Sequence, residues 1–155
     1  MLSCVTTIAR SVLDVFNDLY AMFGREIYCR LFPVILTDRG SEFSNPVPIE
    51  QDENDELRSL VFYCNPSAPY QKGGIEVAHE LVRRVLPKGK SFDDLQQEDI
   101  DLMLSHINSY KRGKLNSRSA YQLFNFIYGD DILPKLNIRE IEANDIVLSP
   151  KLLKK

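Results

Sequence analysis

The chain has little that would mark it as secreted, membrane-bound or held together by cysteine. Its three cysteines are far apart and odd in number, so they form neither a zinc pattern nor a disulfide framework. Their apolar neighbours favour buried thiols in a reducing cytoplasm. No apolar run is long enough to span a membrane, and Arg10 and Asp14 interrupt the N-terminal segment where a signal peptide would need an apolar stretch. We therefore expect a cytoplasmic protein with no membrane partner.

The chain also lacks an excess of positive charge. Its 19 basic and 22 acidic residues give a net charge of −3, which provides no general affinity for the phosphates of DNA. The basic residues are nevertheless gathered in two clusters, Arg83, Arg84, Lys88 and Lys90 in the first and Lys111, Arg112, Lys114 and Arg118 in the second. Such clusters can attract nucleic acid locally, and they are equally typical of solvated surfaces.

Repeats and low-complexity segments are absent too, and 44% hydrophobic residues with 26% charged residues are typical of a globular protein. The apolar periodicity predicts a helix, a strand, a short helix or turn, a strand and then further helices, which is the order of an α/β layer. The helices are expected at 5–23, 75–86, 97–110 and 118–128, and the strands at 32–37, 60–63 and, within an irregular tail, 146–148. Residues 44–59 are expected to form a short helix or turn and then an exposed acidic loop.

The most informative stretch is residues 37–43, Thr-Asp-Arg-Gly-Ser-Glu-Phe, which follows the strand expected at 32–37. The strand delivers the carboxylate of Asp38 to its end, and Gly40 permits a tight turn there. Oxygen ligands at such a position suit a hard divalent cation. Asp is also favoured in turns for its own hydrogen bonds, so taken alone Asp38 is compatible with an ordinary turn.

A second motif covers residues 64–76, Cys-Asn-Pro-Ser-Ala-Pro-Tyr-Gln-Lys-Gly-Gly-Ile-Glu. Its prolines and glycines exclude regular structure and predict a loop, after which a helix begins with Glu76 in its first turn. Taken alone, Glu76 would be a favourable partner for the helix dipole. Helical spacing places His79, Glu80 and Arg83 on the same side of this helix as Glu76.

Together the two motifs resemble the catalytic core of the DDE transposases and retroviral integrases, and above all the IS-thirty family of bacterial insertion-sequence transposases. The chain is similar to that family in its T-D-x-G-S-E-F turn, its aromatic-x-(N/D)-P-x-x-P-(Y/W)-Q-(K/R)-G loop, its Glu-bearing helix and the Leu-Pro-Lys-Gly at 86–89. The resemblance covers nearly the whole chain. It implies a bacterial cytoplasmic protein, a ribonuclease H-like fold, and metal-dependent cleavage and transfer of DNA strands.

The resemblance also implies roles for particular residues. Asp38 and Glu76 would be the second Asp and the Glu of the catalytic triad and would hold Mg²⁺ or Mn²⁺. The DNA of transposon ends would be the partner, with contacts from Lys72, His79, Arg83, Arg84 and Lys88. An exposed helix residue without a ligand is an equal alternative for His79. Glu80 is expected to pair with Arg83 or Arg84 within the helix rather than to bind metal.

Two departures from the family pattern concern the candidate ligands directly. Arg39 stands where the family usually has Asn, and it would place a cation beside the metal. Ile75 and Val77 flank Glu76, where the family often has Asn on both sides.

A further departure lies at the start of the chain, because the family carries three strands and its first catalytic Asp before the first helix. Asp14 and Asp18 fall in the predicted helix and are rejected as substitutes. We therefore expect an N-terminally truncated α/β integrase core at 1–128 with a C-terminal tail at 129–155. We also expect an exposed edge or apolar face at the first strand, and weak or absent metal binding.

The same absence leaves the function of the isolated chain open. With one ligand missing, the chain alone is expected to be inactive, although its parent family is enzymatic. One alternative is a non-enzymatic remnant that binds DNA or full-length transposase, or associates with itself. The other is a repurposed globular domain without a nucleic-acid role, which the net charge of −3 favours.

Overall fold

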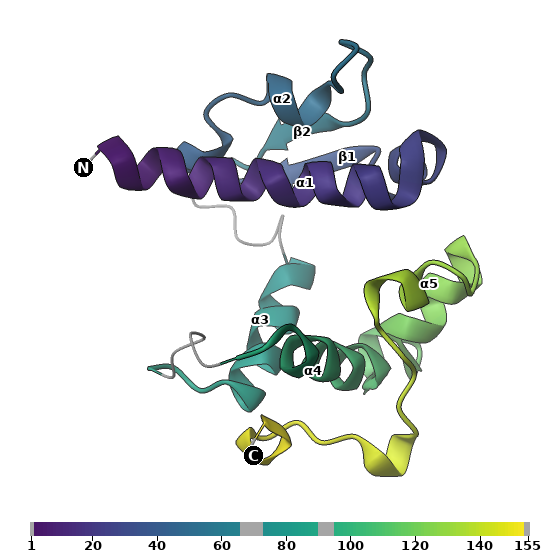
Figure 1. Cartoon of the computed structure of the whole chain (residues 1–155). Helices are drawn as coiled ribbons and strands as arrows, with labels where there is room; N and C mark the ends of the chain where they lie inside the picture. Colours follow the sequence, from purple (N-terminus) through teal and green to yellow (C-terminus); the bar gives the residue numbers. More distant parts are fainter. Residues whose placement is uncertain (1, 66–72, 90–94, 154–155) are drawn as a thin grey trace. The chain divides into compact units, whose positions relative to one another are not determined.

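The structure, a computed structural model, describes residues 2–65, 73–89 and 95–153 (Figure 1). The chain divides into two units, Met1–Lys72 and Gly73–Lys155, and each is described here by itself. The first unit combines helices with a small parallel sheet, and the second is mainly helical. The predicted mixture of helices and strands is therefore confirmed. No helix in the described ranges is long and apolar enough to cross a membrane.

The first unit begins with α1, Leu2–Leu31, which is broken at Gly24. Gly24 has φ 72° and ψ 165°, a conformation that glycine adopts more readily than other residues. The predicted end of the helix at Gly24 is thus a kink, and the prediction missed the helical residues that follow it. Those residues place Tyr28 in the core, where its ring centroid lies 5.1 Å from that of Tyr20 and 5.0 Å from that of Phe32.

Two short strands follow α1, as the sequence predicted, and they are parallel. β1, Val34–Thr37, pairs with β2, Leu60–Tyr63, in a register that joins Val34 to Leu60. The connection between them contains a 3₁₀ turn, Ser41–Phe43, and the short helix α2, Val47–Glu50, followed by the exposed residues 53–57. Figure 1 shows α1 running along this unit with α2 and the strands beside it.

A buried arginine joins the elements of this unit. Arg58, only 4% exposed, donates hydrogen bonds to the carbonyl oxygens of Ile49 at 3.0 Å and Pro48 at 2.8 Å. It also donates to Oδ1 of Asn17 in α1 at 2.8 Å, and its guanidinium carbon lies 5.0 Å from the ring centroid of Tyr20. Arg58 therefore links α1 to α2 just before β2 begins.

One face of the two-stranded sheet is apolar and exposed. Its side chains come from alternate positions of both strands: Val34 (54% exposed), Leu36 (43%), Leu60 (41%) and Phe62 (53%). On the opposite face Thr37 is buried, and Ile35 and Val61 are half-buried. Parallel strands are normally covered on both faces. The exposed apolar face that the sequence predicted for the first strand is present.

The second unit is organised around two helices, α3, Gly73–Val85, and α4, Gln97–Ser109. Their buried side chains, Leu81, Val85, Met103 and Ile107, form one cluster. Leu148, Leu152 and Leu153 pack against this cluster, the last two from a 3₁₀ turn at Pro150–Leu153. The C-terminal segment is thus part of the core of this unit. The predicted division at 128/129 between core and tail stays a prediction.

The third helix of this unit, α5, Ala120–Tyr128, has a defined start and end. The side chain of Ser119 accepts a hydrogen bond from the backbone N–H of Gln122 at 3.1 Å, while the side chain of Gln122 accepts one from the backbone N–H of Ser119. This reciprocal pair satisfies two backbone donors at the helix start. Gly129, with φ 97°, ends the helix as predicted. Further 3₁₀ turns lie at Gly113–Leu115, Leu133–Leu136 and Ala143–Asp145.

Two predictions for this unit are wrong in detail. The helix expected from residue 118 begins at Ala120, because β4, Arg118–Ser119, pairs in antiparallel with β3, Lys111–Arg112. The strand expected at 146–148 is not formed. Instead, the backbone N–H of Val147 donates to Nδ1 of the buried His106 at 3.2 Å, and Leu148 packs on the α3–α4 cluster.

Candidate metal and nucleic-acid site

The Asp38 turn lies directly at the end of β1 and is closed by backbone hydrogen bonds. The N–H of Gly40 donates to Oδ1 of Asp38 at 3.4 Å, and the N–H of Phe43 donates to the carbonyl of Gly40 at 3.0 Å. Asp38 is exposed, so its carboxylate is presented to solvent rather than buried in the fold. A carboxylate at a strand end beside a tight turn is what the sequence predicted here.

A second carboxylate lies against the same turn. A Cβ atom on Gly40 would come within 2.6 Å of the carboxylate atoms of Glu42, so the absence of a side chain at Gly40 leaves room for that carboxylate. Asp38 and Glu42 therefore both approach Gly40. The sequence interpretation did not count Glu42 among the metal ligands and named it only as a possible source of a replacement ligand. The signal for it was the glycine standing between two acids in one short turn.

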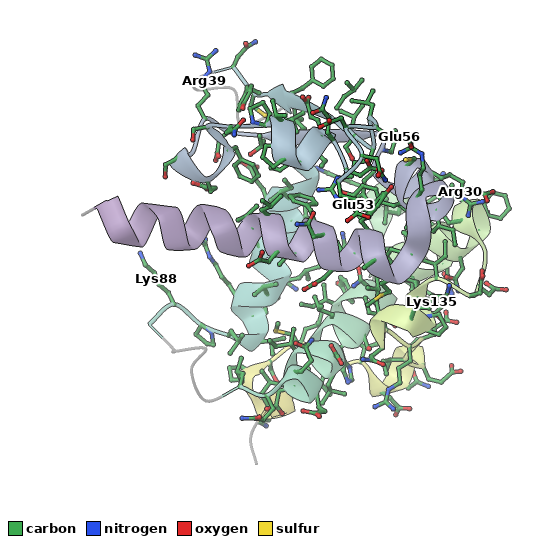
Figure 2. The ribbon with its side chains drawn as sticks, turned by 45° about the horizontal axis from the view of Figure 1, so that its top comes forward. Arg30, Arg39, Glu53, Glu56, Lys88 and Lys135 are labelled. Carbon is green, nitrogen blue, oxygen red and sulfur yellow. The ribbon has the colours of Figure 1, made fainter. Side chains whose placement is uncertain are left out.

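The turn is held against β2 by Tyr63, whose hydroxyl donates to the carbonyl of Phe43. Tyr63 and the turn residues Arg39, Gly40, Ser41, Phe43 and Ser44 line an open hollow of about 450 Å³. Figure 2 shows the side chain of Arg39 extending outward from this turn. A phosphate or another anion approaching the turn would therefore meet a cation next to the two carboxylates.

The second candidate ligand, Glu76, lies in the first turn of α3 and is exposed. His79, Glu80 and Arg83 are exposed as well, whereas Leu81 and Val85 face the core of the unit. The polar face that helical spacing predicted is thus turned to solvent. Glu76 therefore lies on the solvent-exposed side of α3 and does not pack in the core.

The expected pairing of Glu80 is confirmed, because Nη2 of Arg84 donates to Oε1 of Glu80 at 2.6 Å. Lys88 is exposed beyond the end of α3, and Figure 2 shows its side chain extending away from the ribbon. Lys72 and Lys90 lie outside the described residues. The structure thus places Arg83, Arg84 and Lys88 on or just beyond one exposed helix.

The two basic clusters of the sequence meet in one hollow of the second unit. Arg84 from the first cluster and Lys111 from the second line an open hollow of about 410 Å³, together with Tyr110. Apolar side chains of the C-terminal segment, Ile146 and Leu148, complete its wall. Sequence reasoning kept the clusters apart because 26 residues, including a whole helix, lie between Arg84 and Lys111. The packing of α3 beside α4 brings them together.

Comparison with known proteins places these motifs in context. No family model and no solved structure matches the chain. It is 35% identical over 63 residues to the transposase for insertion sequence element IS1086 of Cupriavidus metallidurans, a match that covers 41% of this chain and 19% of that protein. It is 33% identical over 90 residues to a putative integrase of Spiroplasma virus SpV1-R8A2 B, covering 58% and 27%. The chain is a relative of the insertion-sequence transposases.

Its similarity extends to the transposase InsI for insertion sequence element IS30A of Escherichia coli, at 27% identity over 63 residues. The matches span less than a third of each of these proteins, at 19%, 27% and 16% of their lengths.

In this transposase relative, the two candidate metal ligands belong to different units, Asp38 to the first and Glu76 to the second. Within the described residues, no group of three or more His, Cys, Asp or Glu side chains is close enough to hold a metal ion. Asp14 and Asp18 are exposed on the helix α1, in agreement with their rejection as strand-borne ligands. That Asp38 and Glu76 share a metal stays a prediction.

Proposed function

We propose that the chain is the C-terminal part of a DDE-type transposase core with a ribonuclease H-like fold, which acts in metal-dependent cleavage and transfer of DNA strands. The Asp38 turn carries this proposal, because it presents a carboxylate at the end of a strand that pairs in parallel with β2. The exposed Glu76 at the start of α3 and the similarity to transposases support it.

In this proposal, Asp38 and Glu76 hold Mg²⁺ or Mn²⁺, since both ions prefer carboxylate oxygens. Glu42 is a further carboxylate against the same turn. The chemistry that such ions supply is stabilisation of negative charge at the reacting phosphate and activation of the attacking hydroxyl group. The fold positions the two carboxylate-bearing residues, because Asp38 directly follows β1 and the backbone of Glu76 belongs to α3.

The DNA-contacting surface in this proposal comprises the exposed face and end of α3 and the hollow beside it. Arg83 and Lys88 supply cations for phosphates, His79 adds a polar contact, and Lys72 remains a candidate. The hollow adds Arg84 and Lys111 beside the ring of Tyr110. Cations bind the phosphates of DNA, and an aromatic ring can stack on an unpaired base, so this combination suits a strand end.

A paramagnetic test measures the proposed metal site without needing activity. Mn²⁺ broadens the NMR signals of nearby backbone amides, so titration with Mn²⁺ should broaden the amides of Gly40 and Val77 together. Asp38→Asn should abolish broadening at both positions. Asp14→Asn, which removes an exposed carboxylate from α1, is the matched control and should leave both unchanged. Broadening at Gly40 that never extends to Val77 would refute a shared site.

A second candidate function is binding without catalysis, either to DNA or to full-length transposase. The observation that favours it is the lack of a three-ligand cluster among the described residues. The two candidate functions differ in metal binding. Catalysis requires that the Asp38 turn binds Mn²⁺, whereas binding without catalysis does not. Broadening at neither Gly40 nor Val77, together with retained DNA binding, would favour the second candidate.

The role in DNA binding is tested by its salt dependence. Affinity for a transposon-end duplex should fall steeply as salt rises, because contacts to phosphate release counterions. The double variant Arg83→Ala, Lys88→Ala should reduce the slope of log K against log salt by about 2, one for each lost contact. Lys135→Ala, another exposed cation of the second unit, is the control. Absence of any salt-dependent binding would favour a domain repurposed for another role.

A further inference from the structure

The C-terminal segment of the second unit, residues 139–153, is fastened to α4 and is called the strap here. Three buried polar side chains of α4 accept backbone N–H groups of the strap: Oγ of Ser105 from Arg139 at 3.2 Å, Oγ of Ser109 from Ile141 at 2.9 Å, and Nδ1 of His106 from Val147 at 3.2 Å. Figure 1 shows the strap, in yellow, passing below α4 towards the C-terminus. Side chains of one helix thus hold a long irregular segment.

The strap is held more firmly at its two ends than in its middle. The bonds to the two serines lie at its start, and at its end Leu152 and Leu153 pack on the α3–α4 cluster. Between these attachments, the bond from Val147 to His106 is the one hydrogen bond that the described residues of the strap make to α4. The packing of Leu148 on the cluster is the other contact of the middle.

The middle of the strap forms part of the hollow that contains Arg84 and Lys111. Ile146 and Leu148 are half-buried and line that hollow, whereas the side chain of Val147 between them is 37% exposed. Val147 is therefore attached mainly through its backbone. The hydrogen bond to His106 thus positions the two apolar residues on either side of it.

This hydrogen bond exists only while the ring of His106 is neutral. A backbone N–H can only donate, so Nδ1 of His106 must be the acceptor, whereas a protonated imidazole carries a hydrogen on both of its nitrogens. Protonation would therefore set two donors against each other at Val147. The carboxylate of Asp145, two residues before Val147, attracts the protonated ring instead. The two forms of His106 thus favour different contacts with the strap.

Among the described residues, the charged groups that act on the His106 ring come from the strap itself. Burial lowers the pKa of His106, Arg139 lowers it further, and Asp145 raises it. The elements packed on α4 add no charge there: α3 contacts it through the apolar cluster and its charged side chains are exposed, α5 has no acidic or basic side chain, and Lys151 is exposed. The acids of α4 lie in its first two turns.

We propose that the strap is an acid-sensitive switch, in which protonation of His106 releases the backbone at Val147 and lets Ile146 and Leu148 move away from the hollow. The two ends of the strap stay attached, because serine hydroxyl groups and leucine side chains do not titrate. The strap is closed above about pH 6.5 and opens as the pH falls towards the lower native pKa of His106. One proton changes the opening equilibrium by at most about tenfold per pH unit. The switch does not require that the hollow binds DNA.

Amide exchange of the whole chain, followed by NMR from about pH 7.5 to about pH 5, tests the switch. The protection factor of the Val147 amide should fall by up to about tenfold per pH unit below pH 6.5. The Ile141 amide, which is bonded to a hydroxyl group, should keep its protection. The ring signals of His106 should titrate over the same range in the same samples, with the exposed His79, the second of the two histidines, as reference.

Three variants separate this switch from a general loss of packing. His106→Asn offers an acceptor that does not titrate, so protection of Val147 should no longer depend on pH. Arg139→Gln should move the opening to higher pH and Asp145→Asn to lower pH, because they remove the groups that oppose and favour the protonated ring. Constant protection of Val147 down to pH 5 would overturn the proposal. So would a parallel loss of protection at Ile141, or shifts of the two charge variants in the same direction.

Discussion

Replacing Arg58 tests whether a buried cation holds the first unit together. In Arg58→Met the side chain keeps most of its length but loses every hydrogen-bond donor. The carbonyl oxygens of Pro48 and Ile49 and Oδ1 of Asn17 then lose donors that lie at 2.8, 3.0 and 2.8 Å. Leaving a buried acceptor unpaired costs about 1–3 kcal/mol. Burial of the apolar Met side chain offsets part of the total cost for the three acceptors. We expect the free energy of unfolding to fall by about 3–5 kcal/mol.

The assay is urea unfolding followed by circular dichroism and by tyrosine fluorescence, since the chain has seven tyrosines and no tryptophan. Tyr20 and Tyr28 lie 5.0 and 5.6 Å from the guanidinium carbon of Arg58, so their emission reports on this part of the first unit, together with the signal of Tyr110, Tyr121 and Tyr128 from the second. Loss of Arg58 should lower the urea midpoint for the tyrosine signal. Amide exchange in β1 and β2 should increase with it, because Arg58 immediately precedes β2.

Arg25→Met is the matched control for charge and size in the same unit. Arg25 forms ion pairs with Asp52 at 3.2 Å and Glu56 at 3.0 Å, but its side chain is 45% exposed. Because Arg25 is partly exposed, its contacts contribute less than those of a fully buried cation, but the side chain of Asp52 is only 6% exposed, so this variant should lose some stability and less than Arg58→Met. If Arg58→Met were no less stable than Arg25→Met, the reasoning that the buried guanidinium joins α1 to α2 would be refuted.

Three further predictions concern the core, the effect of pH and activity. Leu81→Ala, in the α3–α4 cluster, should lower the stability of the second unit by about 2–4 kcal/mol in urea unfolding, and a smaller loss than for the half-buried Val82→Ala would contradict the packing. Burial, with a smaller contribution from Arg139, lowers the pKa of His106 below its ordinary 6.5, so stability should be complete above about pH 6.5 and fall as the pH drops towards the native pKa. His106→Asn should make the free energy of unfolding less dependent on pH, measured by urea unfolding at several pH values, since asparagine does not titrate. The chain alone should show no Mg²⁺- or Mn²⁺-dependent cleavage of transposon-end DNA; cleavage that Asp38→Asn abolishes would show that a replacement ligand exists.

The sequence predicted the elements of the site well because their signals are local. The apolar run before Asp38 predicted β1 and a second such run predicted β2, whereas their register is known only from the structure. The exposed face of α3 followed from helical spacing alone. The kink at Gly24 was only half predicted, because glycine marks a break but does not say whether the helix resumes. It resumes here because Tyr28 is buried in the core of the first unit.

The errors arise where structure depends on partners distant in sequence. The strands β3 and β4 have two residues each, too few to show an alternating pattern. The run Ile146–Leu148 has the composition of a strand. However, the backbone N–H of Val147 donates to His106, and the side chain of Leu148 packs on the α3–α4 cluster. The hollow that joins Arg84 to Lys111 could not be predicted for the same reason, since it depends on how two helices pack.

The parallel pairing of β1 with β2 has a consequence for the order in which the chain folds. A parallel pair cannot close through a tight turn, so residue 34 must find residue 60 across a long intervening loop before any ladder bond forms. The α3–α4 cluster of the second unit also depends on distant partners, because Leu148, Leu152 and Leu153 pack on it. Since non-local contacts slow folding, we expect the helical turns of α1 and α4 to form before the β1–β2 ladder and the C-terminal contacts. Stopped-flow refolding followed by tyrosine fluorescence and helical circular dichroism would reveal this order as two separate phases.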